Sequence, residues 1–169
     1  KGFNRHLMEL SANFDGIQIH SDVWLKTRPA SSGPAHLFVK AVQMSEQSGE
    51  IDGAVGKSGK NVSQRLTSEL RRAFFAECKD IGARNVLYEI SEHLNIPRAP
   101  IEKRIDNGAA FANLAADYKE QQELNVEGSP SFVLNEGRQK LYGNIGYHLI
   151  EANIRELLRK PSIEEMSWC

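Results

Sequence analysis

The chain has 169 residues, of which 40% are apolar and 25% are charged, and its formal net charge is −1 at pH 7. Because acidic and basic residues are interspersed, no field of one sign would attract nucleic acid or an anionic membrane. No apolar run approaches the roughly 20 residues that a membrane-spanning helix needs, and the N-terminus lacks the basic and then apolar layout of a signal peptide. We therefore expect a cytoplasmic protein that binds neither nucleic acid nor a membrane.

The N-terminal part of the chain begins with an amphipathic pattern. Phe3, Leu7 and Leu10 recur at helical spacing and predict a helix over residues 2–13. Residues 17–20 (IQIH) then alternate briefly, which is typical of a short extended piece.

Two polar stretches flank the next predicted helix. Residues 27–34 (TRPASSGP) are predicted to form a loop because of their proline, serine and glycine content. A helical face returns over residues 36–47. The glycine-rich residues 48–61 that follow are the best candidate for a mobile connection.

The middle of the chain is predicted to be helical throughout. Asn61 stands where an N-cap residue is expected. The apolar residues that follow it recur at every fourth position: Val62, Leu66, Leu70 and Phe74. This helix is predicted to reach Cys78, a partly buried side chain at its end. Further helices are predicted over residues 84–93, 100–106 and 109–124.

The C-terminal part of the chain combines a hairpin with a last helix. Residues 131–134 and 138–142 flank the turn Asn135-Glu136-Gly137 and predict two antiparallel strands. Residues 147–159 predict an amphipathic helix that ends before Pro161. The residues expected to face inward from this helix are Leu149, Ile150, Ile154, Leu157 and Leu158.

The predicted hairpin raises a stability problem. An isolated two-stranded ribbon is at best marginally stable in water, and the four residues IQIH are too few to complete a core sheet among so many helices. The chain also starts at Lys1 rather than at methionine, and its first helix has no cap or lead-in. We therefore expect that further strands belong to an N-terminal segment outside the 169 residues.

Two stretches of the sequence carry a resemblance to a known family. They are EGSPSFVLNEGRQKLYGN at residues 127–144 and RRAFFAECKDIGARNVLYEISEHLNI at residues 71–96. Together they resemble the DsbA-like family, which includes FrnE-type oxidoreductases and the related branch of 2-hydroxychromene-2-carboxylate isomerases and kappa-class glutathione transferases. The resemblance covers about residues 30–159.

The resemblance implies an α/β protein with a thioredoxin-like fold, a large all-helical insertion, and an N-terminal β-α-β part that is absent from the 169 residues. Residues 1–34 would be a connecting helix and loop of the thioredoxin-like domain. The other parts would be a helical insertion domain at 35–124, the hairpin and helix of the thioredoxin-like domain at 125–160, and a tail at 161–169.

The same resemblance assigns a substrate-binding loop to Ser129, Pro130 and Ser131. In that family the proline before the third strand follows a cis peptide bond, so the Ser129–Pro130 bond is expected to be cis. This arrangement would leave the polar groups of Ser129 free to bind an extended substrate in the manner of a strand. Ser31, Ser32 and His36 are additional candidates for residues that face the active site, the alternative being plain helix capping.

The catalytic nucleophile of such enzymes has no counterpart here. A Cys-x-x-Cys motif, or a serine-bearing equivalent, is expected at the N-terminus of the first helix, where the helix dipole stabilises a thiolate. The 169 residues contain only Cys78 and Cys169, which lie far apart in the sequence. We therefore expect no catalytic residue in this chain, and no disulfide-reducing activity by it alone.

Three functions remain open at this point. The first is a DsbA-family thiol-disulfide oxidoreductase whose nucleophilic cysteine lies in the absent segment. The second is a glutathione-dependent isomerase or transferase, and the third is a non-catalytic binding module on the same fold. The expected partner is a thiol or disulfide substrate, either protein, peptide or glutathione, and a homodimer is compatible with the sequence.

No cofactor is expected, although glutathione is a candidate co-substrate. No metal is expected either, because the five histidines form no i, i+4 pair: His6, His20, His36, His93 and His148. The stretch GAVGKSGK at residues 53–60 does not match the phosphate-loop motif G-x-x-x-x-G-K-S. The motif requires its first glycine at position 51, which is occupied by Ile51.

Overall fold

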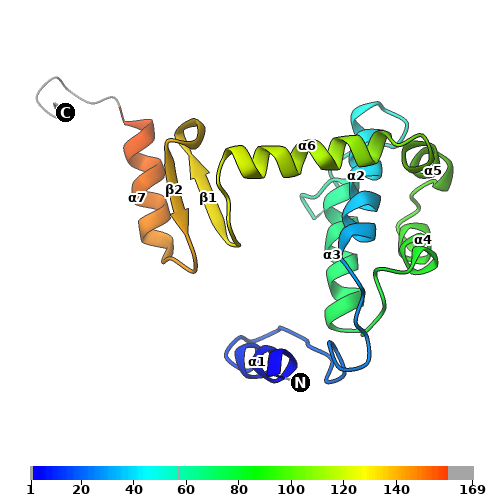
Figure 1. The fold of residues 1–169 in the computed structure, drawn as a ribbon, viewed down its shortest axis with the longest axis horizontal. Helices are drawn as coiled ribbons and strands as arrows, with labels where there is room; N and C mark the ends of the chain where they lie inside the picture. The colour runs from blue at the N-terminus through cyan, green and yellow to red at the C-terminus, as the bar shows by residue number, and fades with distance from the viewer. Residues whose placement is uncertain (1, 57, 160–169) are drawn as a thin grey trace, which may run out of the picture. The chain divides into compact units, whose positions relative to one another are not determined.

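The computed structural model describes residues 2–56 and 58–159 (Figure 1). They divide between residues 115 and 116 into two compact units, each of which is described by itself. The first unit contains α1 (Gly2–Ser11), α2 (Gly33–Gln47), α3 (Val62–Phe75), α4 (Arg84–His93) and α5 (Arg98–Asp106). Helix α6 (Ala109–Glu123) begins in the first unit and ends in the second. The second unit then continues with β1 (Ser131–Leu134), a 3-10 turn (Asn135–Gly137), β2 (Gln139–Tyr142) and α7 (Tyr147–Leu158).

The described residues are therefore mostly helical and contain one two-stranded sheet. This composition agrees with the predicted helical insertion followed by a hairpin. Residues 17–20 form no strand, so the brief alternation of IQIH was no guide to sheet structure.

The core of the first unit lies where α2 packs against α3 and α5. The largest fully buried apolar side chains there are Phe38, Val42, Leu66, Leu87 and Ile101. In Figure 1, α2 and α3 run beside one another as the cyan and green helices. Burying one such side chain contributes about 1.5–3 kcal/mol, so this cluster accounts for much of the stability of the unit.

Helix α3 starts as the sequence predicts. The Asn61 side chain accepts a hydrogen bond from the Gln64 backbone N–H (2.9 Å), and the Gln64 side chain accepts one from the Asn61 N–H (3.1 Å). This reciprocal pair is a capping box. The predicted end of the helix is wrong, since α3 stops at Phe75 and Cys78 lies beyond it with a φ of 56°.

The glycine-rich stretch after α2 is anchored at its start. Ile51 is buried, with 4% of its surface exposed. The Glu50 carboxylate binds Lys103 (2.6 Å) and Arg104 (2.8 Å) of α5. Residues 50 and 51 thus belong to the folded helical unit rather than to a free linker.

The N-terminal segment packs on α3 and on the loop that follows it. The buried Asn4 side chain donates hydrogen bonds to the carbonyls of Val23 (2.7 Å) and Ser21 (3.0 Å). The Trp24 ring makes edge contacts with Phe3 and Phe74, at centroid distances of 5.7 and 5.1 Å. These aromatic contacts hold α1 to the helical unit.

The second unit has no buried core among its described residues. None of its described residues, 116–159, is buried. The predicted inward residues of α7 are partly wrong, because Leu149 is 59% and Leu158 is 79% exposed. A two-stranded ribbon is too narrow to cover the whole apolar face of a helix that packs on it. The remaining apolar residues of α7 therefore stay in contact with solvent.

Candidate functional site

The loop from Gly128 to Ser131 leads directly into β1. Its Ser129–Pro130 peptide bond is cis, which is the geometry that the family resemblance implies. The Ser131 hydroxyl donates to the Gly128 carbonyl (2.5 Å), and the Gly143 N–H donates to the Pro130 carbonyl (3.0 Å). The loop is therefore fixed both to itself and to the end of β2.

Ser129 is the residue of this loop that is both exposed and without hydrogen bonds among the described residues. Its side chain is exposed, as is that of Pro130. Within the described part of the chain, no hydrogen bond uses the backbone N–H or C=O of Ser129. An exposed backbone donor and acceptor on one residue can pair with an extended peptide as a neighbouring strand does.

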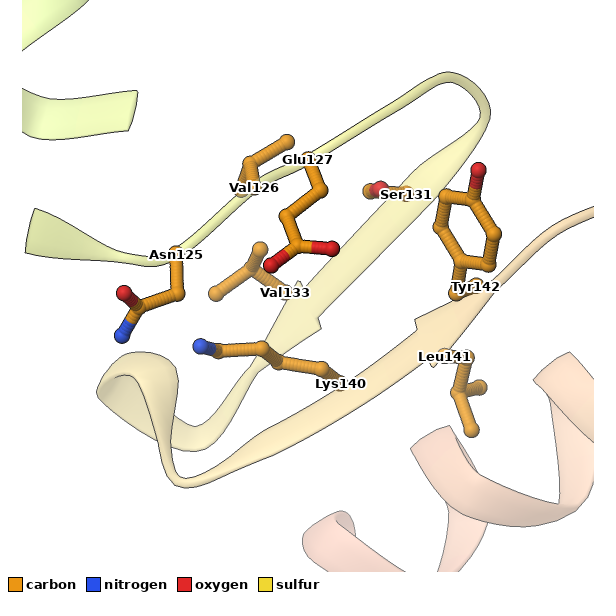
Figure 2. A pocket seen from close by; sticks show the side chains of 8 residues that line it. All are labelled: Asn125, Val126, Glu127, Ser131, Val133, Lys140, Leu141 and Tyr142. Atoms are coloured by element: carbon orange, nitrogen blue, oxygen red, sulfur yellow. The ribbon is translucent and has the colours of Figure 1, made fainter. Parts of the chain in front are cut away.

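A small pocket of about 180 Å³ lies beside the loop (Figure 2). The apolar residues that line it are Val126, Val133 and Leu141, of which Leu141 turns its side chain to the other face of the hairpin. Glu127 and Lys140 also line it, and neither side chain forms an ion pair with another described residue. The remaining lining residues are Asn125, Ser131 and Tyr142. Register explains part of this set, because Ser131 pairs with Tyr142 and Val133 pairs with Lys140, so all four share one face of the hairpin.

The additional candidates Ser31, Ser32 and His36 lie around the N-terminal end of α2, and all three are exposed. The Ser31 hydroxyl accepts a hydrogen bond from the Gly33 N–H (2.9 Å), whereas the Ser32 side chain makes no capping hydrogen bond. Ser32 and His36 both line a pocket of the helical unit. The expectation that they face the active site stays a prediction, because they belong to the other unit than the Pro130 loop.

Cys78 is the only cysteine among the described residues, and it is partly buried in a loop. Its backbone carbonyl accepts a hydrogen bond from the Thr27 hydroxyl (2.7 Å), and its Sγ lies 3.2 Å from Thr27 Oγ1. Cys78 follows the C-terminal end of α3, and the dipole at that end of a helix disfavours a thiolate. Cys169 and the rest of the predicted tail from residue 161 lie outside the described residues.

Among residues 2–56 and 58–159, no group of three or more histidine, cysteine or acidic side chains is arranged to hold a metal ion. None of the helices in this part of the chain has both the length and the apolar character that crossing a membrane requires.

Comparison with known proteins places this geometry in a family. The model of the DSBA-like thioredoxin domain matches residues 35–155, which include the helical unit from α2 onward, the Pro130 loop, the hairpin and most of α7. The chain belongs to the DsbA-like thioredoxin family. The ClpXP adapter protein SpxH of Bacillus subtilis (strain 168) is 24% identical over 173 residues, an alignment that covers 94% of this chain and 53% of SpxH. The chain therefore spans about half the length of this curated relative.

Proposed function

We propose that this chain carries the substrate-binding loop of a DsbA-family thiol-disulfide oxidoreductase. The observation that supports this most directly is Ser129, exposed and unpaired on a loop whose two sides are fixed by the Ser131 and Gly143 hydrogen bonds. A disulfide-bearing peptide would pair with the backbone of Ser129. Pro130 and Ser131 would keep that backbone in place beside the reacting sulfur atoms.

The proposed chemistry needs a thiolate from outside the 169 residues. That thiolate attacks one sulfur of the substrate disulfide, a new sulfur–sulfur bond forms, and the second substrate sulfur leaves as a thiolate. A second thiolate of the enzyme then attacks the mixed disulfide, which leaves the substrate as a dithiol and the enzyme pair oxidised. Cys78 is unsuited to these two steps because it lies in a loop against Thr27 and no second thiol is present among the described residues.

The similarity to SpxH favours a second candidate function. That relative is named as an adapter protein, and an adapter needs a binding surface but no thiol pair. On this alternative, the Ser129 loop would hold a segment of a client protein without any exchange of disulfides. The lack of a Cys-x-x-Cys motif in the 169 residues fits both candidates equally.

The binding role of the loop can be tested on the chain itself. Isotope-labelled protein is titrated with an eight-residue peptide whose central cysteine carries a methyl disulfide. We expect amide shifts at Ser129, Ser131 and Gly143. A peptide methylated at the backbone nitrogens around its cysteine should bind much more weakly, since it cannot donate to the Ser129 carbonyl. Equal binding of both peptides would show that the peptide does not pair with the Ser129 backbone as a strand, and would contradict this part of the proposal.

The coding sequence upstream of Lys1 separates the candidates. A Cys-x-x-Cys motif at a predicted helix N-terminus supports the oxidoreductase. A serine in its place would select the glutathione-dependent branch. A segment without either nucleophile would leave the adapter as the function that fits.

A further inference from the structure

A pocket of about 190 Å³ lies between α2 and α3 in the helical unit. Its walls are apolar and come from Ala35, Val39, Leu70, Phe74, Phe75 and Ile81. An apolar cavity of about 150 Å³ in a protein is large enough to bind benzene. The pocket therefore has room for a ligand with one aromatic ring and a short linker.

Arg71 lines this pocket and has no ion-pair partner among the described residues. It belongs to α3, its side chain is exposed, and it also forms no hydrogen bond with another described residue. Its neighbour Arg72 differs, because that guanidinium is bound by Glu69 (2.8 Å) and by Glu77. The residues that line the pocket include no aspartate or glutamate. Arg71 therefore keeps its donors free for a ligand.

The polar groups of the pocket suit a carboxylate in particular. The planar fork of an arginine matches the two oxygens of a carboxylate and binds them with two parallel hydrogen bonds. Ser32 and His36 also line the pocket and supply further hydrogen-bonding groups. Ser32 is available for this because it makes no capping hydrogen bond to α2.

We propose that this pocket binds a small apolar carboxylic acid. The apolar part, about the size of one ring, fills the space between Val39, Phe75 and Ile81, and the carboxylate pairs with Arg71. Small-molecule binding sites are generally apolar pockets with a small number of polar groups that orient the ligand. This site uses residues of the helical unit alone and does not depend on the oxidoreductase proposal.

The test compares two probes that share a ring but differ in charge. The 169-residue chain is titrated with 3-phenylpropionate and with 3-phenylpropan-1-ol, and amide shifts are followed by NMR. We expect both probes to shift Val39, Leu70 and Ile81, with the acid binding about tenfold more tightly. Shifts confined to other parts of the chain, or no saturable binding of the acid, would overturn the proposal.

Two variants of matched charge locate the carboxylate. Arg71→Gln should weaken binding of the acid about tenfold and leave binding of the alcohol unchanged. Arg72→Gln, which removes the same charge from the next residue, should leave both affinities unchanged. Equal losses in the two variants would show a general charge effect and would contradict a carboxylate site at Arg71.

A third variant tests the apolar part. Val39→Phe places a ring into the hollow and should abolish the binding of both probes, with folding checked by circular dichroism. If Val39→Phe folds and still binds the acid, the ring is not in this pocket. If that variant does not fold, the comparison of Arg71→Gln with Arg72→Gln decides the proposal by itself, since both positions are exposed.

Discussion

Tyr142 lies directly against Gly128: a Cβ atom at position 128 would stand 2.6 Å from the Tyr142 hydroxyl oxygen and 3.0 Å from its Cε2. Tyr142 is nevertheless 66% exposed, so the close approach depends on the absence of a side chain at Gly128 rather than on burial of the ring. The contact joins the end of β2 to the loop that carries Ser129. Together with the Gly143 hydrogen bond to Pro130, it attaches the loop both to β2 and to the residue that follows this strand.

Gly128→Ala should displace the Tyr142 ring from the loop. The new methyl group takes the space of the phenol oxygen, and the ring can move outward because it is exposed. We therefore expect a loss of less than about 1 kcal/mol in the free energy of unfolding, with clear NMR shifts of Ser129 and Gly143 amides. Gly146→Ala is the matched control, since a Cβ there would meet nothing within 4 Å. Similar shifts at Ser129 in both variants would contradict the contact.

The N-caps of α2 and α3 should differ in what they contribute to stability. Asn61→Ala removes the side-chain oxygen that accepts from the Gln64 N–H, and should lower the free energy of unfolding by about 1 kcal/mol. Ser32→Ala, at the cap position of α2, should change it by less than about 0.5 kcal/mol, because Ser32 makes no such bond. Urea denaturation of both variants measures the difference. Equal losses would show that Ser32 caps α2 in solution.

Burial of leucine differs between the two units. Leu66 is 0% exposed in the helical core, so Leu66→Ala should cost about 2–5 kcal/mol. Leu149 on α7 is 59% exposed, so Leu149→Ala should change the free energy of unfolding by no more than about 0.5 kcal/mol. The second unit should be followed by its own NMR signals during denaturation. A large loss in Leu149→Ala would mean that a partner, such as a second copy of the chain, covers α7.

The sequence allowed good predictions wherever the cause was local. The start of α3 followed from Asn61 and the apolar repeat after it, and the hairpin followed from the turn residues. Long-range contacts could not be predicted in this way. Ile51 belongs to the core although it lies within a glycine-rich stretch, and Trp24 meets Phe3 and Phe74 from a backbone with a φ of 62°. Helical spacing on α7 showed which residues share a face, but spacing carries no information on whether another element covers that face.

The same limit applies to the candidate site. The family resemblance singled out Ser129, Pro130 and Ser131 through a motif of a few adjacent residues; the cis bond before Pro130 is confirmed, and the substrate-binding role stays a prediction. Tyr142 was missed, although the hairpin register places it opposite Ser131 and could have indicated it. Arg71 could not have been singled out by sequence, because its distinguishing property is that no acidic neighbour binds it.

Acid should weaken the link between residue 50 and α5. Hydrogen bonds from Lys103 and then Arg104 lower the pKa of Glu50 from 4.5 to about 2. A carboxylate with a lowered pKa stabilises the folded state above its ordinary pKa, and this stabilisation is lost as the pH falls from about 4.5 to about 2. Glu50→Gln should therefore be less stable than the wild type at pH 6, and the gap should close toward pH 2. Glu50, Lys103 and Arg104 are all partly exposed, so added salt should narrow the gap as well.

The control for this titration is Glu9→Gln, because the Glu9 carboxylate pairs with no described residue. At pH 6 this variant should match the wild type in stability, because the substitution removes no ion pair. A gap for Glu50→Gln that stays constant from pH 6 to pH 2 would mean that the pairs with Lys103 and Arg104 do not form in solution.

The chain of 169 residues alone should not reduce insulin disulfides. Catalysis of this reaction needs an activated thiolate and a second thiol to release the mixed disulfide. The described residues contain only Cys78, which is partly buried in a loop with its Sγ 3.2 Å from Thr27 Oγ1. In a turbidity assay with dithiothreitol, we expect the same rate with and without the chain, and no change in Cys78→Ser. Thioredoxin serves as the positive control. Rapid precipitation that depends on Cys78 would place the nucleophile in this chain and overturn our account of where the chemistry occurs.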